Sequence, residues 1–206
     1  MDASTTGPRI TAKGQITRQR IISTAAGLFH LHGISATRLD DVKDAAGVSS
    51  SQLYLYFADK DALVKAVIAY QTDMMVDIQR TANFKTKAGR RAWRDSIVDT
   101  QRRRNCEGGC PLGSLTYEVT KPDADARDII AASFRRWQEI LESDLRMLQS
   151  SGKLSYEQTP QKLAMASIAA VQGGLLLCQV QRSTEPLEAA LDSILEFIDA
   201  LSLPAP

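Results

Sequence analysis

Apolar residues in the first sixty positions recur with a helical period that is broken at short intervals by glycine. A set of apolar residues recurs with helical spacing, namely Ile21, Ile22, Ala25, Leu28 and Phe29, and Gly33 follows them as a stop. A second, much shorter apolar face runs from Leu39 to Ala46 and ends at Gly47. The pattern therefore predicts one helix of ordinary length followed by a very short one.

Polar residues that can cap a helix mark where the second and third helices begin. Thr37 is the expected N-cap of the second helix, with Asp40 three residues later. Ser49 and Gln52 have the spacing of a capping box, and Leu53 begins the inward face of the third helix. Because only a tight turn separates these short helices, we expect a helix-turn-helix unit, with an ordinary helical hairpin as the alternative.

The rest of the chain shows only helical periodicity. The expected helices cover about residues 61–80, 88–104 and 123–148, and two more begin at Pro160 and Pro186. The predicted fold class is all-α, with an N-terminal three-helix helix-turn-helix domain and a larger C-terminal helical domain.

The last two predicted helices carry faces suited to a partner. Small residues in the first of them permit close helix approach, and the second repeats apolar residues at coiled-coil spacing. The residues concerned are Ala166, Ala170, Gly174, Leu187, Leu191, Ile194 and Ile198. Paired with their copies about a two-fold axis, these helices would form a four-helix bundle. Alternatively, a monomer would bury the same stripe against its own fourth helix.

Composition and charge narrow the function classes. With 44% hydrophobic and 24% charged residues the chain is globular, and its net charge of +1 means that DNA binding must rest on local arrangement. The longest apolar stretch, 164–180, contains Ser167, Gln172 and Gln179 and lies too late in the chain to be a signal peptide. We expect a cytoplasmic protein with no membrane partner.

Histidine and cysteine usage argues against catalysis and metal binding. His30 and His32 both fall in the first domain, and no nucleophile–base pair or phosphate-binding glycine loop accompanies them. Cys106 and Cys110 allow a metal site or a sensing disulfide, but their spacing lacks the other ligands of a zinc site, which favours structural thiols. We therefore expect no enzyme, cofactor or bound metal; a protein-binding scaffold is the remaining alternative class.

Two stretches resemble a known family of regulators. From Thr17 to Leu63, and above all in AAGVSSSQLYLYFADKDAL, the chain resembles the DNA-binding domain of the TetR family. The segment CEGGCPLGS, residues 106–114, is similar to the LmrA/YxaF-like subgroup. The resemblance implies a repressor with a flexible arm (1–16), a DNA-binding domain (17–62) and an effector-binding and dimerisation domain (63–206). Its implied partners are palindromic double-stranded operator DNA, a small-molecule effector and a second copy of the chain.

Candidate DNA-contacting residues gather at the two short helices. They are Thr37, Arg38, Ser49, Ser50, Ser51, Gln52, Tyr54, Tyr56 and Lys60. Gln52 offers the donor and acceptor that adenine recognition requires, or serves only as a cap. The resemblance assigns Tyr54 and Tyr56 to the DNA backbone or to thymine methyl groups and Lys60 to a phosphate. The alternative is that Tyr56 packs in the domain core and Lys60 is only solvated. Asp40 and Asp41 add acidic charge near the same face.

Aromatic residues of the second domain are candidates for an effector pocket. Trp93, Tyr117, Phe134 and Trp137 lie on or between its predicted helices. An apolar aromatic cavity would suit a hydrophobic or planar aromatic effector. The alternative is that these side chains are ordinary core.

Overall fold

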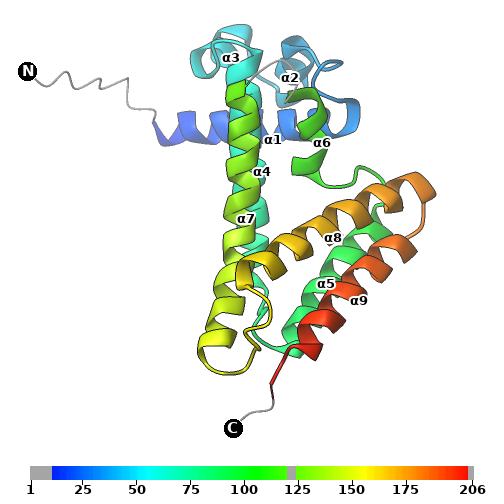
Figure 1. The fold of residues 1–206 in the computed structure, drawn as a ribbon. Coiled ribbons are helices and arrows are strands. Elements are labelled where there is room, and N and C mark those ends of the chain that lie inside the picture. The colour runs from blue at the N-terminus through cyan, green and yellow to red at the C-terminus, as the bar shows by residue number, and fades with distance from the viewer. Residues whose placement is uncertain (1–10, 120–123, 204–206) are drawn as a thin grey trace, which may run out of the picture. The chain divides into compact units, whose positions relative to one another are not determined.

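The computed structural model describes residues 11–119 and 124–203, and its elements in these ranges are helices joined by short loops (Figure 1). The helices are α1 (Ala12–His32), α2 (Leu39–Ala46), α3 (Ser50–Tyr56), α4 (Lys60–Thr81), α5 (Lys87–Arg103), α6 (Pro111–Val119), α7 (Ala124–Ser150), α8 (Pro160–Gln181) and α9 (Glu185–Ala200). The predicted all-α class is confirmed. The chain divides into two compact units, residues 1–70 and 71–206, so the predicted boundary after residue 62 falls within α4.

Helix α1 begins earlier than the sequence predicts. Thr11 caps it, because its side-chain oxygen accepts a hydrogen bond of 3.2 Å from the Gly14 amide. The predicted flexible arm, 1–16, is therefore wrong for residues 12–16, which are helical. Residues 1–10 of that arm lie outside the described residues.

The first unit has a small core that the three helices share. Ile21, Phe29, Leu53 and Phe57 are nearly or fully buried in it. The guanidinium of Arg18 lies 5.3 Å from the centre of the Phe57 ring, a cation–π distance. These contacts fix α3 with its apolar side inward.

The second half of helix α4 buries polar as well as apolar residues. Gln71, Val76 and Gln79 are buried, whereas Met74 and Ile78 are about half exposed. Because glutamine interrupts the apolar pattern, periodicity alone does not identify the buried side of this part of the helix.

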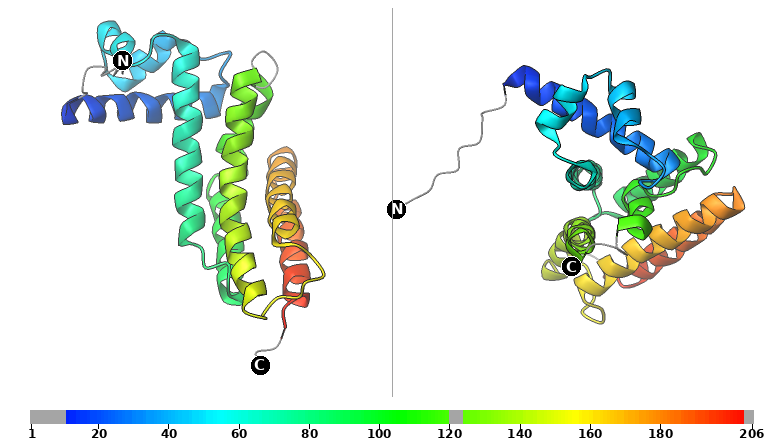
Figure 2. Two further views of the ribbon diagram at one scale, coloured as in Figure 1. Left: turned by 60° about the vertical axis from the view of Figure 1, so that its left-hand side comes forward. Right: turned by 90° about the horizontal axis from the view of Figure 1, so that it is seen from above.

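The second unit is built on α8. Its neighbours are α7 and α9, and α5 packs against α9, as the views in Figures 1 and 2 also show. By length and composition α8 could cross a membrane, with a mean hydropathy of 1.7. Helices in protein cores have the same composition, and Leu163, Val171 and Cys178 of α8 are buried against its neighbours.

The apolar seam of α9 is covered within one chain. Leu187, Leu191 and Ile198 are completely buried. A Cβ atom added at Gly174 of α8 would lie 2.8 Å from the Cα atom of Leu187, so glycine permits this close crossing. This part of the expected dimer surface is therefore occupied by intrachain packing.

Candidate functional site

The turn between α2 and α3 depends on Gly47. Its φ of 62° and ψ of 45° are left-handed, which glycine adopts without the steric cost of a side chain. A Cβ atom here would meet nothing within 4 Å, so the requirement is conformational rather than one of space. The Gly47 amide donates back to Asp44, which closes α2 before α3 begins.

The capping box predicted at the start of α3 is present. The Ser49 amide donates to Oε1 of Gln52 at 3.0 Å, and the Gln52 amide donates to Oγ of Ser49 at 3.2 Å. Because Oε1 accepts from the Ser49 amide and also from the Ser49 hydroxyl at 3.4 Å, both of its lone pairs are used, and only the side-chain nitrogen of Gln52 is left for a base. Two-point adenine recognition would require the cap to open.

The outer surface of α3 carries short polar groups and one aromatic ring. Ser50, Ser51 and Gln52 are exposed, and 57% of Tyr54 is accessible. Oγ of Ser51 lies 2.9 Å from Oγ of Ser49, so the two hydroxyls share a hydrogen bond. Tyr56 is half-buried, a position that leaves both of its predicted roles open.

Helix α2 starts differently from the prediction. Thr37 is not its N-cap: the residue is only 3% exposed, and its hydroxyl donates to the Gly33 carbonyl at 2.7 Å. Arg38 occupies the cap position instead, and its amide donates to the Asp41 carboxylate at 2.7 Å. Burial leaves the Thr37 side chain poorly placed for DNA, whereas Arg38 is exposed.

The acidic residues of α2 have local partners. Asp41 serves the cap, and Asp40 forms an ion pair of 2.9 Å with Lys43. The hydrogen bond from Lys43 holds the pKa of Asp40 below its ordinary value.

Lys60, the first residue of α4, is half-buried beside Asp59, whose carboxylate accepts the Ala62 amide at 2.7 Å. Among the described residues neither Arg38 nor Lys60 forms an ion pair, although the charge of Arg38 also helps to lower the pKa of Asp40.

Two of the predicted effector-site residues share a hydrogen-bond partner that the sequence analysis did not identify. The indole N–H groups of Trp93 and Trp137 both donate to Oε1 of Gln79, at 2.8 and 3.0 Å. Phe134 stacks on Trp137 at 6.4 Å between ring centres. The side chain of Tyr117, the fourth predicted residue, lies outside the described residues. Gln79 escaped sequence analysis because a single polar residue on a long helix carries no signal of burial.

The side-chain nitrogen of Gln79, unlike its oxygen, has no hydrogen-bond partner among the described residues. Its Nε2 atom is buried without a hydrogen-bond partner in the described part of the chain, and so is Oε1 of Gln71. An unpaired buried polar group costs about 1–3 kcal/mol. A molecule with a hydrogen-bond acceptor would relieve that cost at Nε2.

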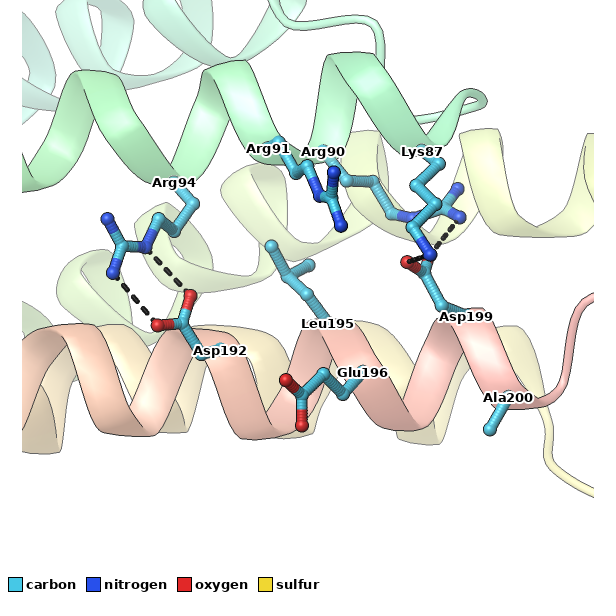
Figure 3. Close-up of a pocket in the computed structure, with 9 residues that line it drawn as sticks. All are labelled: Lys87, Arg90, Arg91, Arg94, Asp192, Leu195, Glu196, Asp199 and Ala200. Carbon is cyan, nitrogen blue, oxygen red and sulfur yellow. Dashed lines mark hydrogen bonds and ion pairs between the residues drawn. The ribbon is translucent and has the colours of Figure 1, made fainter.

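A surface pocket of about 480 Å³ lies between α5 and α9, and its lining is charged. Figure 3 shows Arg94 paired with Asp192, and Lys87 with Arg90 on Asp199. These pairs span α5 and α9 at distances of 2.8–3.2 Å. The pocket therefore contains helix-joining ion pairs and does not match a hydrophobic effector.

One face of α8 exposes an apolar stripe. It consists of Met165, Ala169, Gly173, Leu176 and Val180, which follow each other at intervals of four or three residues. Leu176 is 62% and Val180 72% exposed, and Phe197 of α9 is 46% exposed. A Cβ atom at Gly173 would meet nothing within 4 Å. Such a stripe of exposed apolar residues is typical of a protein–protein interface.

Cysteine, histidine and carboxylate groups do not gather into a metal site in the ranges that the structure describes. The polar groups at the aromatic cluster around Gln79 are the glutamine amide and two indole N–H groups. Among the described residues this cluster contains no nucleophile paired with a base, the arrangement that catalysis would need.

Comparisons with known proteins match both units. Residues 21–67 match the family model for bacterial regulatory proteins of the tetR family, and residues 88–193 match the C-terminal domain of LmrA/YxaF-like transcriptional regulators. The second match alone spans half of the chain.

Curated relatives extend over almost the whole sequence. A transcriptional regulator in the lacX 3′ region of Lactococcus lactis is 27% identical over 181 residues, 85% of this chain and 90% of the relative. The repressor DhaR of Mycobacterium sp. strain GP1 is 24% identical, covering 88% and 91%. LmrA of Bacillus subtilis is 23% identical, covering 82% and 90%.

Solved structures share the fold. A TetR transcriptional regulator from Chloroflexus aurantiacus superposes with a TM-score of 0.81 at 23% identity, covering 95% of this chain and all of that one. The regulatory protein TetR from Rhodobacter sphaeroides gives a TM-score of 0.78 at 22% identity, covering 88% and 98%.

Proposed function

The chain belongs to the TetR family of bacterial transcriptional regulators, in its LmrA/YxaF-like group, and we propose that it is a dimeric repressor released from a palindromic operator by a small molecule. The observation that carries the proposal is α3, a helix held by a left-handed Gly47 turn with its polar side exposed. The regulators in this family are not enzymes. The name of the Mycobacterium relative, DhaR, as a repressor supports repression rather than activation.

We assign α3 to the major groove of DNA. Ser50 and Ser51 would approach base edges directly or through water, and Gln52 would donate its free amide N–H to a base acceptor.

The DNA backbone would be held by Tyr54, Lys60 and Arg38. Ser49 would act chiefly as the cap that orients the helix, and Thr37 would stabilise the preceding loop through its bond to Gly33.

We assign the exposed stripe of α8, together with Phe197 and the half-buried Ile194 of α9, to the dimer interface. Ala166 and Ala170, predicted for this role, remain accessible on α8 and belong to the same proposal. Gly174, Leu187, Leu191 and Ile198 are buried in the single chain and are left out of it. A two-fold arrangement would place two α3 helices on one operator, which explains a palindrome.

The effector we propose is a small hydrophobic or aromatic molecule that carries a hydrogen-bond acceptor. Trp93, Phe134 and Trp137 supply the aromatic surroundings, and the unpaired Nε2 of Gln79 supplies the donor. Because such regulators act on chromosomal DNA, we place the protein in the cytoplasm.

Substitutions on α3 and at the start of α4 distinguish contacts to the DNA backbone from contacts to the bases. We expect Tyr54→Ala and Lys60→Ala to weaken binding to every DNA sequence, each by about tenfold, and Lys60→Ala to lower the slope of log affinity against log salt by about one. Ser50→Ala and Gln52→Ala should instead change the preferred bases by about 1–3 kcal/mol at one position. Fluorescence anisotropy with a library of labelled duplexes measures both effects.

Leu31→Ala, which truncates an exposed apolar residue of α1, serves as the matched control. Unchanged binding by all four α3 and α4 variants would rule out this interface.

A further inference from the structure

The loop between α5 and α6 is fixed to the end of α8 on both sides of a cysteine. The Arg182 guanidinium, just beyond α8, donates to the Asn105 carbonyl at 3.5 Å and to the Glu107 carboxylate at 2.9 Å. Further along the loop, a Cβ atom added at Gly109 would lie 2.9 Å from Oε1 of Gln179. Residues 105–109 therefore lie directly on the last turns of α8.

This packing brings Cys106 against Cys178 of α8. Cys106 lies close enough to contribute to the raised pKa of Cys178, and the two side chains are 5% and 0% exposed. Cys110 has a different role, since its Sγ accepts the Gly113 amide at 3.3 Å in the first turn of α6. All three thiols are free. The structure thus pairs Cys106 with a cysteine distant in sequence, whereas the sequence considered only its neighbour Cys110.

Cys106, although only 5% exposed, lines a polar surface pocket of about 670 Å³ together with Arg102, Asn105, Glu107 and Arg182. The backbone of Cys106 is left-handed, with a φ of 59°, a conformation that side chains other than glycine rarely adopt. Cys178 lies behind it, away from solvent. The arrangement therefore has one cysteine in the wall of the pocket and a more deeply buried cysteine next to it.

We propose that Cys106 and Cys178 form an intrachain disulfide when the protein reacts with a small hydroperoxide. In the first step the Cys106 sulfur attacks the distal oxygen of the peroxide. An S–O bond forms, the O–O bond breaks, and the alcohol or water leaves with the thiol proton, which gives a sulfenic acid.

In the second step the Cys178 sulfur attacks the sulfur of Cys106. An S–S bond forms, the S–O bond breaks, and hydroxide leaves and takes up the Cys178 proton as water. Two thiols are oxidised and one peroxide is reduced. Cys178 is the resolving thiol because it is completely buried, whereas Cys106 lines the pocket. Burial and the neighbouring Cys106 raise the pKa of Cys178 to about 12, which lowers the rate of this second step because the thiolate is the nucleophile.

The test treats the native full-length protein with hydrogen peroxide or tert-butyl hydroperoxide, then alkylates the remaining thiols in denaturant and maps peptides by mass spectrometry. We expect loss of two of the three alkylatable thiols and a linked Cys106–Cys178 peptide. Cys110→Ser is the matched control and should form the same link. Cys178→Ser should stop at a sulfenic acid on Cys106 that dimedone traps, and Cys106→Ser should give neither product.

Three intact thiols after peroxide treatment, a link to Cys110, or a link between chains would overturn the proposal. The wild-type map decides the matter even if a variant folds poorly. Because the chemistry does not involve DNA, its failure would leave the proposed repressor function untouched.

Discussion

Replacing Leu176 and Val180 with aspartate is expected to turn the protein into a monomer and to weaken operator binding by at least about a hundredfold. Both side chains are largely exposed in the single chain, so the charges cost little there. In the proposed dimer each subunit would bury two new carboxylates without partners, which costs several kcal/mol. Sedimentation velocity and DNA anisotropy on the same samples measure the two effects.

Leu31→Asp in α1 is the matched control, because Leu31 is also a strongly exposed leucine, at 72%. It should leave the protein dimeric. A double variant that stays dimeric at micromolar concentration would place the interface elsewhere.

Replacing Gln79 with leucine is expected to destabilise the second unit by about 2–4 kcal/mol. The change keeps the size of the side chain but removes the oxygen that accepts both tryptophan N–H groups, and each buried donor left unpaired costs about 1–3 kcal/mol. Loss of the unpaired Nε2 atom offsets part of this cost. Urea unfolding followed by tryptophan fluorescence and circular dichroism measures the difference.

Gln71→Leu provides a control on the same helix. Gln71 is buried and its Oε1 has no hydrogen-bond partner within residues 11–119 and 124–203, so the same substitution should be nearly neutral or stabilising. Equal destabilisation by the two changes would mean that the shape of the side chain matters and the indole hydrogen bonds do not.

Sequence periodicity predicted the helices well because each helix needs one apolar face whatever covers it. The same fact explains what it missed. Leu187 and Leu191 of α9 form a regular seam, but spacing does not say whether the covering helix comes from the same chain or from a partner. The structure fills that seam with intrachain contacts and leaves Leu176 and Val180 open instead.

Polar residues were harder to place than apolar ones. The capping box of Ser49 and Gln52 is local, so sequence spacing was sufficient to predict it. Gln79 and Cys178 acquire their roles from partners that are distant along the chain, namely two tryptophans and Cys106. No local pattern carries that information.

A hydroxyl-radical footprint of the dimer on the intergenic DNA beside its own gene tests the central proposal most directly. Two α3 helices on one duplex should protect two half-sites related by a dyad, with centres about 10 base pairs or a multiple apart. Tyr54→Ala combined with Lys60→Ala should remove both protected regions together. A well-folded dimer that protects no DNA, or protects a single site without symmetry, would contradict the account.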